Sequence, residues 1–178
     1  PLRNALYKNN RDGTFTDVAE KAGVALQPEN PDLVADHTGA TFGDFDGDGK
    51  LDLFVAGYVM YDFKNAPVVG STSVKTTTCQ YRAVNVMCGP RGLEGAEDHL
   101  FHNNGDGTFT EVTKKAGFTD TNRYYGLGTV FVDVNGDGKV DLAVADDSTP
   151  NYLYINKGDG TFEDASYTSG YAVNEAGR

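Results

Sequence analysis

Short apolar runs, separated by glycine and aspartate, alternate along the whole chain. Typical runs are "LDLFVAG" at 51–57 and "VDLAVAD" at 140–146, and neither shows a helical period. Apolar runs of this length, bounded by turn-forming residues, are typical of buried β-strands. The pattern therefore predicts an all-β chain.

The strand pattern is organised in repeats. "GATFGDFDGDGKLDLFVA" at 39–56 recurs as "GTVFVDVNGDGKVDLAVA" at 128–145. A second element occurs three times, as "LYKNNRDGTFTDVAEKAG" from Leu6, "LFHNNGDGTFTEVTKKAG" from Leu100 and "LYINKGDGTFEDASYTSG" from Leu153. Asp-Gly between β-forming residues is a strong hairpin signal, so this second element predicts three hairpins.

Together the repeats predict β-propeller blades of four antiparallel strands. One unit consists of strand, acidic loop, strand, connection, strand, Asp-Gly turn and strand, and such sheets bury their faces against one another. The expected divisions are an outer hairpin of a preceding blade with its connection at 1–37, a blade at 38–118 with an insertion at about 58–98, a compact blade at 119–168 and the start of a following blade at 169–178.

The strand order also assigns the loops to two faces. In an up-and-down blade the first and third turns lie at one end and the second turn at the other, so the acidic loops and the Asp-Gly turns should share a face. The insertion and the connection "ADDSTPN" at 145–151 should share the opposite face. We expect a protein or glycan partner to bind there, because loops on a rigid scaffold carry most binding surfaces.

The acidic loops have the spacing of cation-binding loops, with side-chain oxygens at alternate positions. The expected ligands are Asp44, Asp46, Asp48, the carbonyl of Lys50 and Asp52 in the first loop, and Asp133, Asn135, Asp137, the carbonyl of Lys139 and Asp141 in the second. Calcium takes six to eight oxygen ligands in a flexible cage, whereas zinc prefers histidine or cysteine. The loops therefore predict two Ca²⁺ sites, and the alternative is acidic surface turns without metal.

An EF-hand is excluded by the residues around these loops. An EF-hand loop needs a bidentate glutamate at position 12 and helices on both sides. Position 12 is Val55 in the first loop and Val144 in the second, and the flanking segments have the character of strands. We therefore expect calcium loops that join two strands of one blade.

The charge of the chain agrees with a cation-binding protein. The formal net charge is −11, and seven aspartates lie in the two loops, so two divalent ions would bring the charge to about −7. Such acidity disfavours nucleic acid as a partner. No apolar run reaches the about 20 residues that a membrane-spanning helix needs.

The two cysteines, Cys79 and Cys88, lie within the insertion. No histidine accompanies them at zinc-binding spacing, so we expect a disulfide that closes a small loop, and hence an oxidising compartment. Free buried thiols are the alternative.

No motif of catalysis is present: the chain has no nucleophile elbow, phosphate-binding loop or HExxH helix. His99 and His102 should point to opposite faces of a strand, and we expect ordinary packing of both. His37 could lie in the core or line a central channel.

Two further groups could contact a ligand on the predicted partner-binding face. Asp146 and Asp147 are clustered carboxylates outside the calcium loops, and a solvated turn is the alternative for them. Tyr124 and Tyr125 could stack on sugars, or could fill the seam between blades.

The repeats resemble a known family. "FGDFDGDGKLDLFVAG" and "NGDGKVDLAVAD" are similar to the FG-GAP, or VCBS, repeats of integrin-like β-propellers. "CQYRAVNVMCGPRGLEGAEDHLFHNNGDGTF" and "DDSTPNYLYINKGDGTFEDASYTSGYAVNEAGR" resemble more closely the bacterial cartilage-acidic-protein-like proteins that often carry an ASPIC/UnbV segment. The resemblance implies a calcium-binding, usually seven-bladed propeller in a secreted or cell-surface bacterial protein. Asn135 stands where the first loop has Asp46, so the second loop carries less negative charge and should bind calcium more weakly.

Two whole blades and two partial ones cannot close a ring. We therefore expect a piece of a longer protein, or copies that complete one another through their open blade edges. The favoured function is a non-enzymatic, calcium-stabilised extracellular module for protein interaction, cell adhesion or structural assembly. The alternatives are a carbohydrate-binding propeller and, less favoured, a calcium-dependent polysaccharide lyase, which would need a cation exposed to its substrate.

Overall fold

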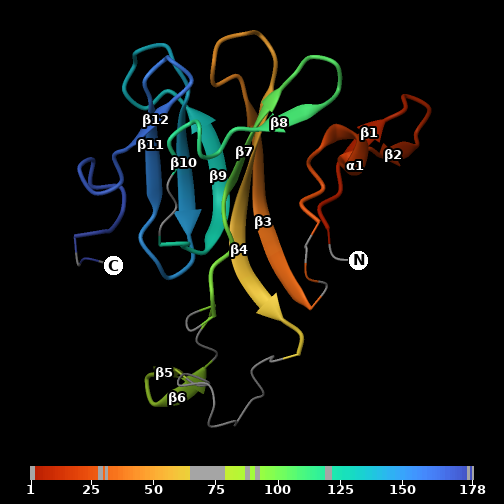
Figure 1. The fold of residues 1–178 in the computed structure, drawn as a ribbon. Coiled ribbons are helices and arrows are strands. Elements are labelled where there is room, and N and C mark those ends of the chain that lie inside the picture. The colour runs from red at the N-terminus through yellow and green to blue at the C-terminus, as the bar shows by residue number, and fades with distance from the viewer. Residues whose placement is uncertain are drawn as a thin grey trace.

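A computed structural model of the chain describes residues 3–27, 30, 32–64, 79–86, 89–90, 93–118, 122–175 and 177, without the side chains of 79–81 and 85–86. It contains two four-stranded antiparallel sheets (Figure 1). The first has the order β3 (Leu33–Gly43), β4 (Asp52–Asp62), β7 (His99–Asn103) and β8 (Phe109–Glu111). The second has the order β9 (Gly126–Val132), β10 (Asp141–Asp146), β11 (Tyr152–Asn156) and β12 (Phe162–Asp164).

The predicted fold class, propeller blades of four antiparallel strands, is confirmed by these sheets. Each acidic loop joins the first two strands of its sheet, and each Asp-Gly turn joins the last two. The strand pair β3–β4 is longer than the repeats indicate, because β3 begins at Leu33 and β4 continues to Asp62. Its pairing is irregular between Asp36 and Gly39, which marks the point where the repeat ends and an extension of both strands begins.

The N-terminal segment forms the remaining Asp-Gly hairpin, of β1 (Tyr7–Asn9) with β2 (Phe15–Asp17). A short helix, α1 (Ala19–Ala22), follows it, and the strand pattern does not predict this helix. The helix ends at Gly23, whose left-handed conformation lets its N–H and that of Val24 bond back to carbonyls of the helix. No other helix occurs in the described residues, and none there could cross a lipid bilayer.

The inserted segment contains the small hairpin of β5 (Cys79–Tyr81) and β6 (Val84–Val86). Cys88 and the side chain of Cys79 lie outside the described residues, so the disulfide remains a prediction.

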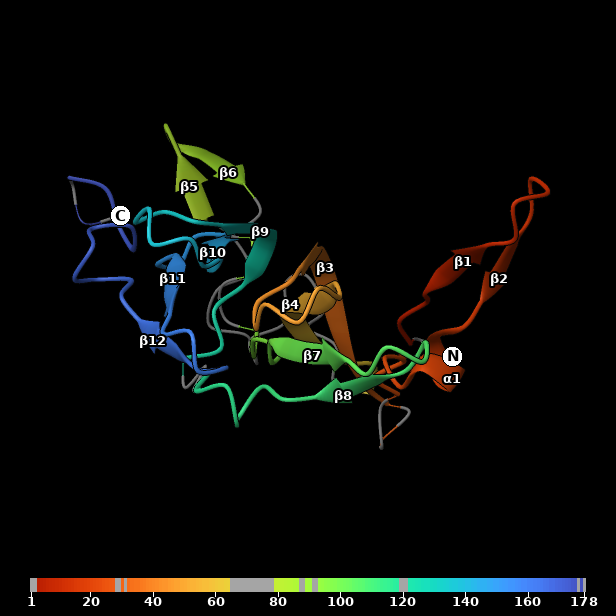
Figure 2. The same ribbon diagram turned by 90° about the horizontal axis from the view of Figure 1, so that it is seen from above.

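The two blades pack face to face, as Figure 2 shows from above: β3 and β9 lie adjacent, and the sheets diverge toward β8 and β12. The close approach requires a glycine, because a Cβ at Gly43 would lie 2.5 Å from the ring of Phe131. The shared core is apolar and largely aromatic; its buried members are Phe45, Phe54, Ala56, Leu100, Ala116, Phe118, Leu142, Val144, Tyr152, Tyr154 and Phe162.

The opposite face of the first blade packs against the N-terminal segment. Leu53, Val55 and Phe101 form a second core cluster with the apolar residues of α1 and the residues that follow it. The first blade is therefore covered on both sides, whereas β9 in the second blade leaves Val130 and Val132 exposed.

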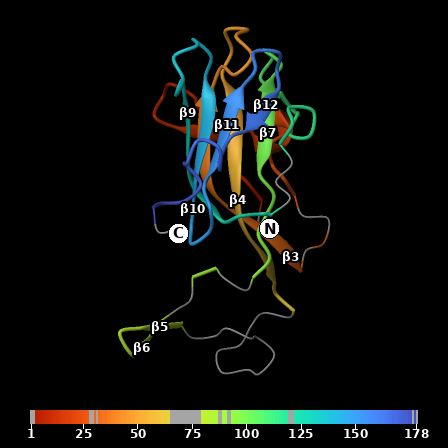
Figure 3. The same cartoon turned by 90° about the vertical axis from the view of Figure 1, so that its left-hand side faces the viewer.

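The loops lie on two faces, as the strand order predicts. The acidic loops and Asp-Gly turns lie at one end of the sheets, and the β5–β6 hairpin of the insertion and the 147–151 connection lie toward the other (Figures 1 and 3). A hydrogen bond of 2.9 Å from the hydroxyl of Tyr58 to Asp147 Oδ2 links the end of β4 to that connection.

Candidate metal centre

The first acidic loop is shaped by hydrogen bonds to its own aspartates. Asp44 Oδ1 accepts the backbone N–H groups of Gly47 and Asp48 at 2.8 and 3.1 Å, and its Oδ2 accepts that of Gly49 at 2.9 Å. The two glycines have φ of 76° and 83°, a conformation that few other residues adopt without strain. The sequence Asp-x-x-Gly-x-Gly therefore folds the loop around its first carboxylate.

Asp52 closes the loop from below and is completely buried. Its Oδ1 accepts the backbone N–H of Asn103 at 2.8 Å, and its Oδ2 accepts that of Phe45 at 3.1 Å. Burial raises the pKa of Asp52, and these two hydrogen bonds oppose that shift. A buried carboxylate at the base of a loop is a strong anchor for a cation, because the ion offsets the cost of burying its charge.

The loop brings three predicted ligands together. Oxygen atoms of Asp44, Asp46 and Asp52 all lie within 4.8 Å of one another. Ligands on opposite sides of one calcium ion are separated by about 5 Å, so the carboxylates lie at distances that a shared ion can span. Asp48 instead forms an ion pair with the ammonium of Lys50, which lowers the pKa of Asp48.

The second loop has the same internal hydrogen bonds. Asp133 accepts the N–H groups of Gly136, Asp137 and Gly138 at 2.7, 3.2 and 2.9 Å, and these bonds lower its pKa. Asp141 is buried and accepts backbone N–H groups through both oxygens.

The second loop differs from the first at position 3, where Asn135 offers an amide oxygen in place of a carboxylate. Asp137 is paired with Lys139 at 2.6 Å, as Asp48 is with Lys50, and this pairing lowers the pKa of Asp137. Within the described ranges, no three acidic, histidine or cysteine ligand atoms converge at this loop.

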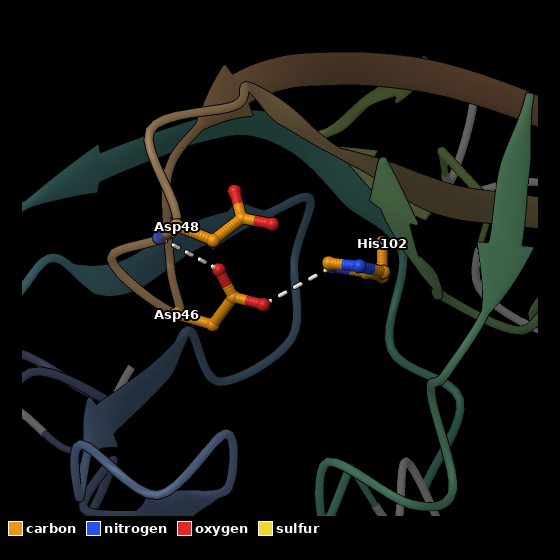
Figure 4. Close-up of side chains that lie close together, drawn as sticks. All are labelled: Asp46, Asp48 and His102. Carbon is orange, nitrogen blue, oxygen red and sulfur yellow. Dashed lines mark hydrogen bonds and ion pairs between the residues drawn. The ribbon is translucent and has the colours of Figure 1, made fainter. Parts of the chain in front are cut away.

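His102 is a residue of this region whose position the sequence pattern does not reveal. It projects from β7 beside the first loop, with Nδ1 3.1 Å from Asp46 Oδ2 and 3.3 Å from Asp52 Oδ1 (Figure 4). Asp46, Asp48 and His102 form a second group whose ligand atoms lie within 4.8 Å. The expectation that His99 and His102 occupy opposite faces is consistent with their contacts, since His99 stacks on Phe101 instead. His102 packs edge-on against Phe45 with ring centroids 6.5 Å apart, and in addition it lies within ion-pair distance of Asp46 and Asp52.

A pocket of about 550 Å³ opens beside this group. Its lining includes Asp46, Asp48 and His102 from the first blade, and Asp159 from the Asp-Gly turn of the second. An ion at the first loop can therefore be approached from solvent between the two blades.

The other candidate residues are engaged in packing. Tyr124 stacks on Tyr152 with ring centroids 5.0 Å apart, and the hydroxyl of Tyr125 donates to the carbonyl of Leu93 at 2.9 Å. Burial and a hydrogen bond with Tyr167 raise the pKa of Tyr124 to about 12. These tyrosines fill the seam between the blades, one of the two alternatives that the sequence leaves open.

At the other face, Asp147 accepts hydrogen bonds from Tyr58 and Ser148, and the backbone N–H of Asp146 bonds to Asn151. His37 lies in β3, packed edge-on against His99 with ring centroids 5.6 Å apart. Burial lowers the pKa of His37 to about 4.

Comparison with known proteins agrees with this architecture. FG-GAP-like repeats match residues 2–55, 86–144 and 133–177, which is most of the chain. Over 62 residues, 35% of the chain, it is 40% identical to cartilage acidic protein 1 of Homo sapiens and 39% identical to that of Mus musculus. The protein of the same name from Xenopus tropicalis is 36% identical.

The match spans only 9% of the length of these relatives, so it concerns the repeats and not the whole of those proteins. All three relatives are vertebrate proteins, and the bacterial origin implied by the resemblance remains a prediction. Because the repeat matches cover most of the chain and together contain its two acidic loops and three Asp-Gly hairpins, the chain belongs to the FG-GAP-like repeat family.

Proposed function

We propose that this chain is a non-enzymatic, calcium-binding propeller segment of an extracellular protein, and that two Ca²⁺ ions hold its acidic loops in place. The proposed use is interaction with a protein or glycan, adhesion or structural assembly at the face opposite the loops. None of the names of the matched relatives denotes an enzyme.

One observation carries the proposal: the oxygens of Asp44, Asp46 and Asp52 converge in a loop that its own backbone holds in shape. Three carboxylates at this separation repel one another, and the repulsion is largest for the buried Asp52. A divalent cation converts that repulsion into attraction. Oxygen donors alone favour calcium or magnesium, and the flexible loop geometry favours calcium.

The second loop supports the same role with a lower charge. Its hydrogen bonds repeat those of the first loop at corresponding positions, and Asn135 can ligate through its amide oxygen. We expect weaker binding there, because one carboxylate is replaced by a neutral group.

Calcium acts in this proposal through linkage to folding. An ion that binds the folded loop but not the unfolded chain stabilises the fold, by about 2.7 kcal/mol when its concentration is a hundred times the dissociation constant. Extracellular calcium would provide that support. The loops join the inner strands of each blade, so the ions would stiffen the sheet end at which neighbouring blades meet.

The tyrosines that could serve the carbohydrate-binding alternative are engaged in contacts within the protein. Tyr124 stacks on Tyr152, and Tyr125 packs edge-on against Tyr58 and donates a hydrogen bond to Leu93. His37 and His99 pack against one another at a distance from the acidic loops, on the side of the first blade that faces the N-terminal segment.

Thermal unfolding of the 178-residue chain in millimolar calcium and in excess chelator tests the proposal. We expect a melting temperature several degrees higher in calcium, and a much smaller rise in magnesium. Equal melting temperatures in calcium and chelator would refute calcium binding as the source of stability.

A further inference from the structure

The imidazole of His102 lies at the first acidic loop, where the ring packs edge-on against Phe45 with centroids 6.5 Å apart. Its Nδ1 is buried and makes no hydrogen bond, although carboxylate oxygens of Asp46 and Asp52 lie 3.1 and 3.3 Å away. Both oxygens are near enough for an ion pair, but neither is placed to accept an N–H from the ring. A buried polar atom left in this way is costly unless another group satisfies it.

A cation between these groups would satisfy all of them. A neutral imidazole presents a lone pair at Nδ1, and the negative charge of two carboxylate oxygens 3.1 and 3.3 Å from that nitrogen is unfavourable for it. An ion coordinated by the nitrogen and the oxygens removes this unfavourable interaction. The ligand atoms of Asp46, Asp48 and His102 lie within 4.8 Å of one another, a separation that one ion can span (Figure 4).

The histidine is specific to the first loop. The Asp-Gly hairpins align Leu100–Asn103 with Leu153–Asn156 and with Leu6–Asn9, which places Ile155 and Lys8 at the position of His102. Neither residue can donate a nitrogen lone pair in the way imidazole does. The chain therefore contains two loops with matching oxygen ligands, of which one has an added nitrogen.

We propose that His102 is a ligand of the first loop, which makes that loop a mixed carboxylate–imidazole site for divalent transition metals as well as for calcium. Imidazole and carboxylate together suit ions such as Zn²⁺ and Mn²⁺, whereas calcium prefers oxygen alone. The second loop, with Ile155, is an oxygen-only site. This inference rests on the proposed function, since it assumes that the first loop binds a cation.

The pocket beside His102 gives an ion at the first loop access to solvent. It is bordered by Asp46 and His102 on one side and by the Asp-Gly turn at 158–161 on the other. An ion at the first loop can gain or lose a water ligand there, which permits the lower coordination numbers that transition metals accept.

Cadmium NMR on the 178-residue chain tests the proposal, because ¹¹³Cd²⁺ has nearly the size of calcium and its resonance shifts when nitrogen joins the ligands. With ¹¹³Cd²⁺ in excess we expect two resonances, one of them at the shift of a nitrogen-containing site. In His102→Ile, which copies the second loop, that resonance should move to the oxygen-only range. In Ile155→His the other resonance should move the opposite way.

A zinc titration by calorimetry provides the affinity. Mutation of a residue that hydrogen-bonds to a metal ligand lowers the metal affinity about 10- to 100-fold. Loss of a ligand itself in His102→Ile should therefore lower the affinity for Zn²⁺ at least about tenfold. The loss for Ca²⁺ should be smaller. His99→Gln controls for adventitious histidine binding, and His102→Gln serves if the isoleucine variant does not fold.

The proposal fails if cadmium does not bind, if His102→Ile leaves both resonances unchanged, or if His99→Gln and not His102→Ile removes the nitrogen-shifted one. Calcium binding by the same sample distinguishes a failure of this inference from a failure of the proposed function. Calcium bound with no effect of His102 on cadmium overturns only this inference, whereas no binding of either ion overturns the proposed function as well.

Discussion

The two acidic loops share their internal hydrogen bonds but not their surroundings. Asp44 and Asp133 accept the same three backbone N–H groups of their loops. At position 2, however, Phe45 is buried against Phe162 of the second blade, with ring centroids 5.7 Å apart, while Val134 is 48% exposed. The loop itself is therefore encoded locally, and its burial depends on the blade packed beside it.

Asn156 shows how a neighbouring blade stabilises a loop. Its side-chain amide donates to the carbonyl of Phe45 at 2.7 Å and to that of Val140 at 3.0 Å, so it joins the first loop to the second blade. Asn103, at the corresponding position of the first blade, donates to the carbonyl of Leu51 in its own blade. The comparison indicates that the two acidic loops are coupled across the blades through Asn156.

Alanine at position 2 should give the largest difference between the loops. Phe45→Ala removes a buried aromatic side chain from the shared core and should cost about 3–5 kcal/mol of unfolding free energy. Val134→Ala should cost less than about 0.5 kcal/mol, because the valine is exposed. Urea unfolding of both variants measures this, and similar costs would contradict the described difference in burial.

Alanine at position 3 should separate the loops by their calcium-dependent stability. Asp46→Ala removes a carboxylate that converges with two others, and should abolish most of the about 2.7 kcal/mol that a well-occupied site contributes. Asn135→Ala should lose less, since the amide is a weaker ligand. Melting in calcium and in chelator measures both, and losses that persist undiminished in chelator would assign Asp46 a role other than binding.

The coupling between blades should be measurable at the two asparagines. Asn156→Ala leaves the carbonyls of Phe45 and Val140 without their donor in a buried position, and should cost about 2–3 kcal/mol. Asn103→Ala should cost about 1 kcal/mol. Chemical denaturation distinguishes these values, and a larger loss at Asn103 would reverse the comparison.

A further expected effect is a pH dependence that arises in the first blade. The folded-state pKa of His37, about 4, lies below its ordinary value of 6.5, so the unfolded chain binds more protons between these values. The contribution of His37 is therefore fully present above pH 6.5 and is lost as the pH falls toward 4, with a slope of at most about 1.4 kcal/mol per pH unit. The ring of His99 is the titratable group packed against it.

His37→Gln should flatten the stability profile between pH 6.5 and 4 without changing it above pH 7. Equilibrium unfolding at a series of pH values provides the measurement. An unchanged profile would assign the acid sensitivity to the carboxylates instead.

Sequence reasoning was most successful where structure is local. The acidic loops and Asp-Gly hairpins follow from aspartates and glycines at fixed spacing, and their repetition predicted the strand order of each blade. The short helix α1 was missed, because its apolar residues, Ala19 and Ala22, cover the first blade only once the blade has formed.

The role of His102 could not be predicted in the same way. Alternation in a strand assigned it to the face opposite His99, but the register that pairs Leu53 with Phe101 sets β7 beside the first loop. That register is a property of the folded sheet. Contacts between blades, such as the bond from Asn156 to Phe45, likewise join residues far apart in sequence. A signal that could have revealed His102 is that the three hairpins differ at this position, with Lys8, His102 and Ile155, while their other residues repeat closely.

Calorimetric titration of the 178-residue chain with calcium, alongside Asp46→Ala and Asp137→Ala, tests the central claim most directly. The account predicts two ions bound per chain, the tighter one lost in Asp46→Ala and the weaker one lost in Asp137→Ala. Absence of binding heat in the unaltered chain, or two ions retained in both variants, would contradict it.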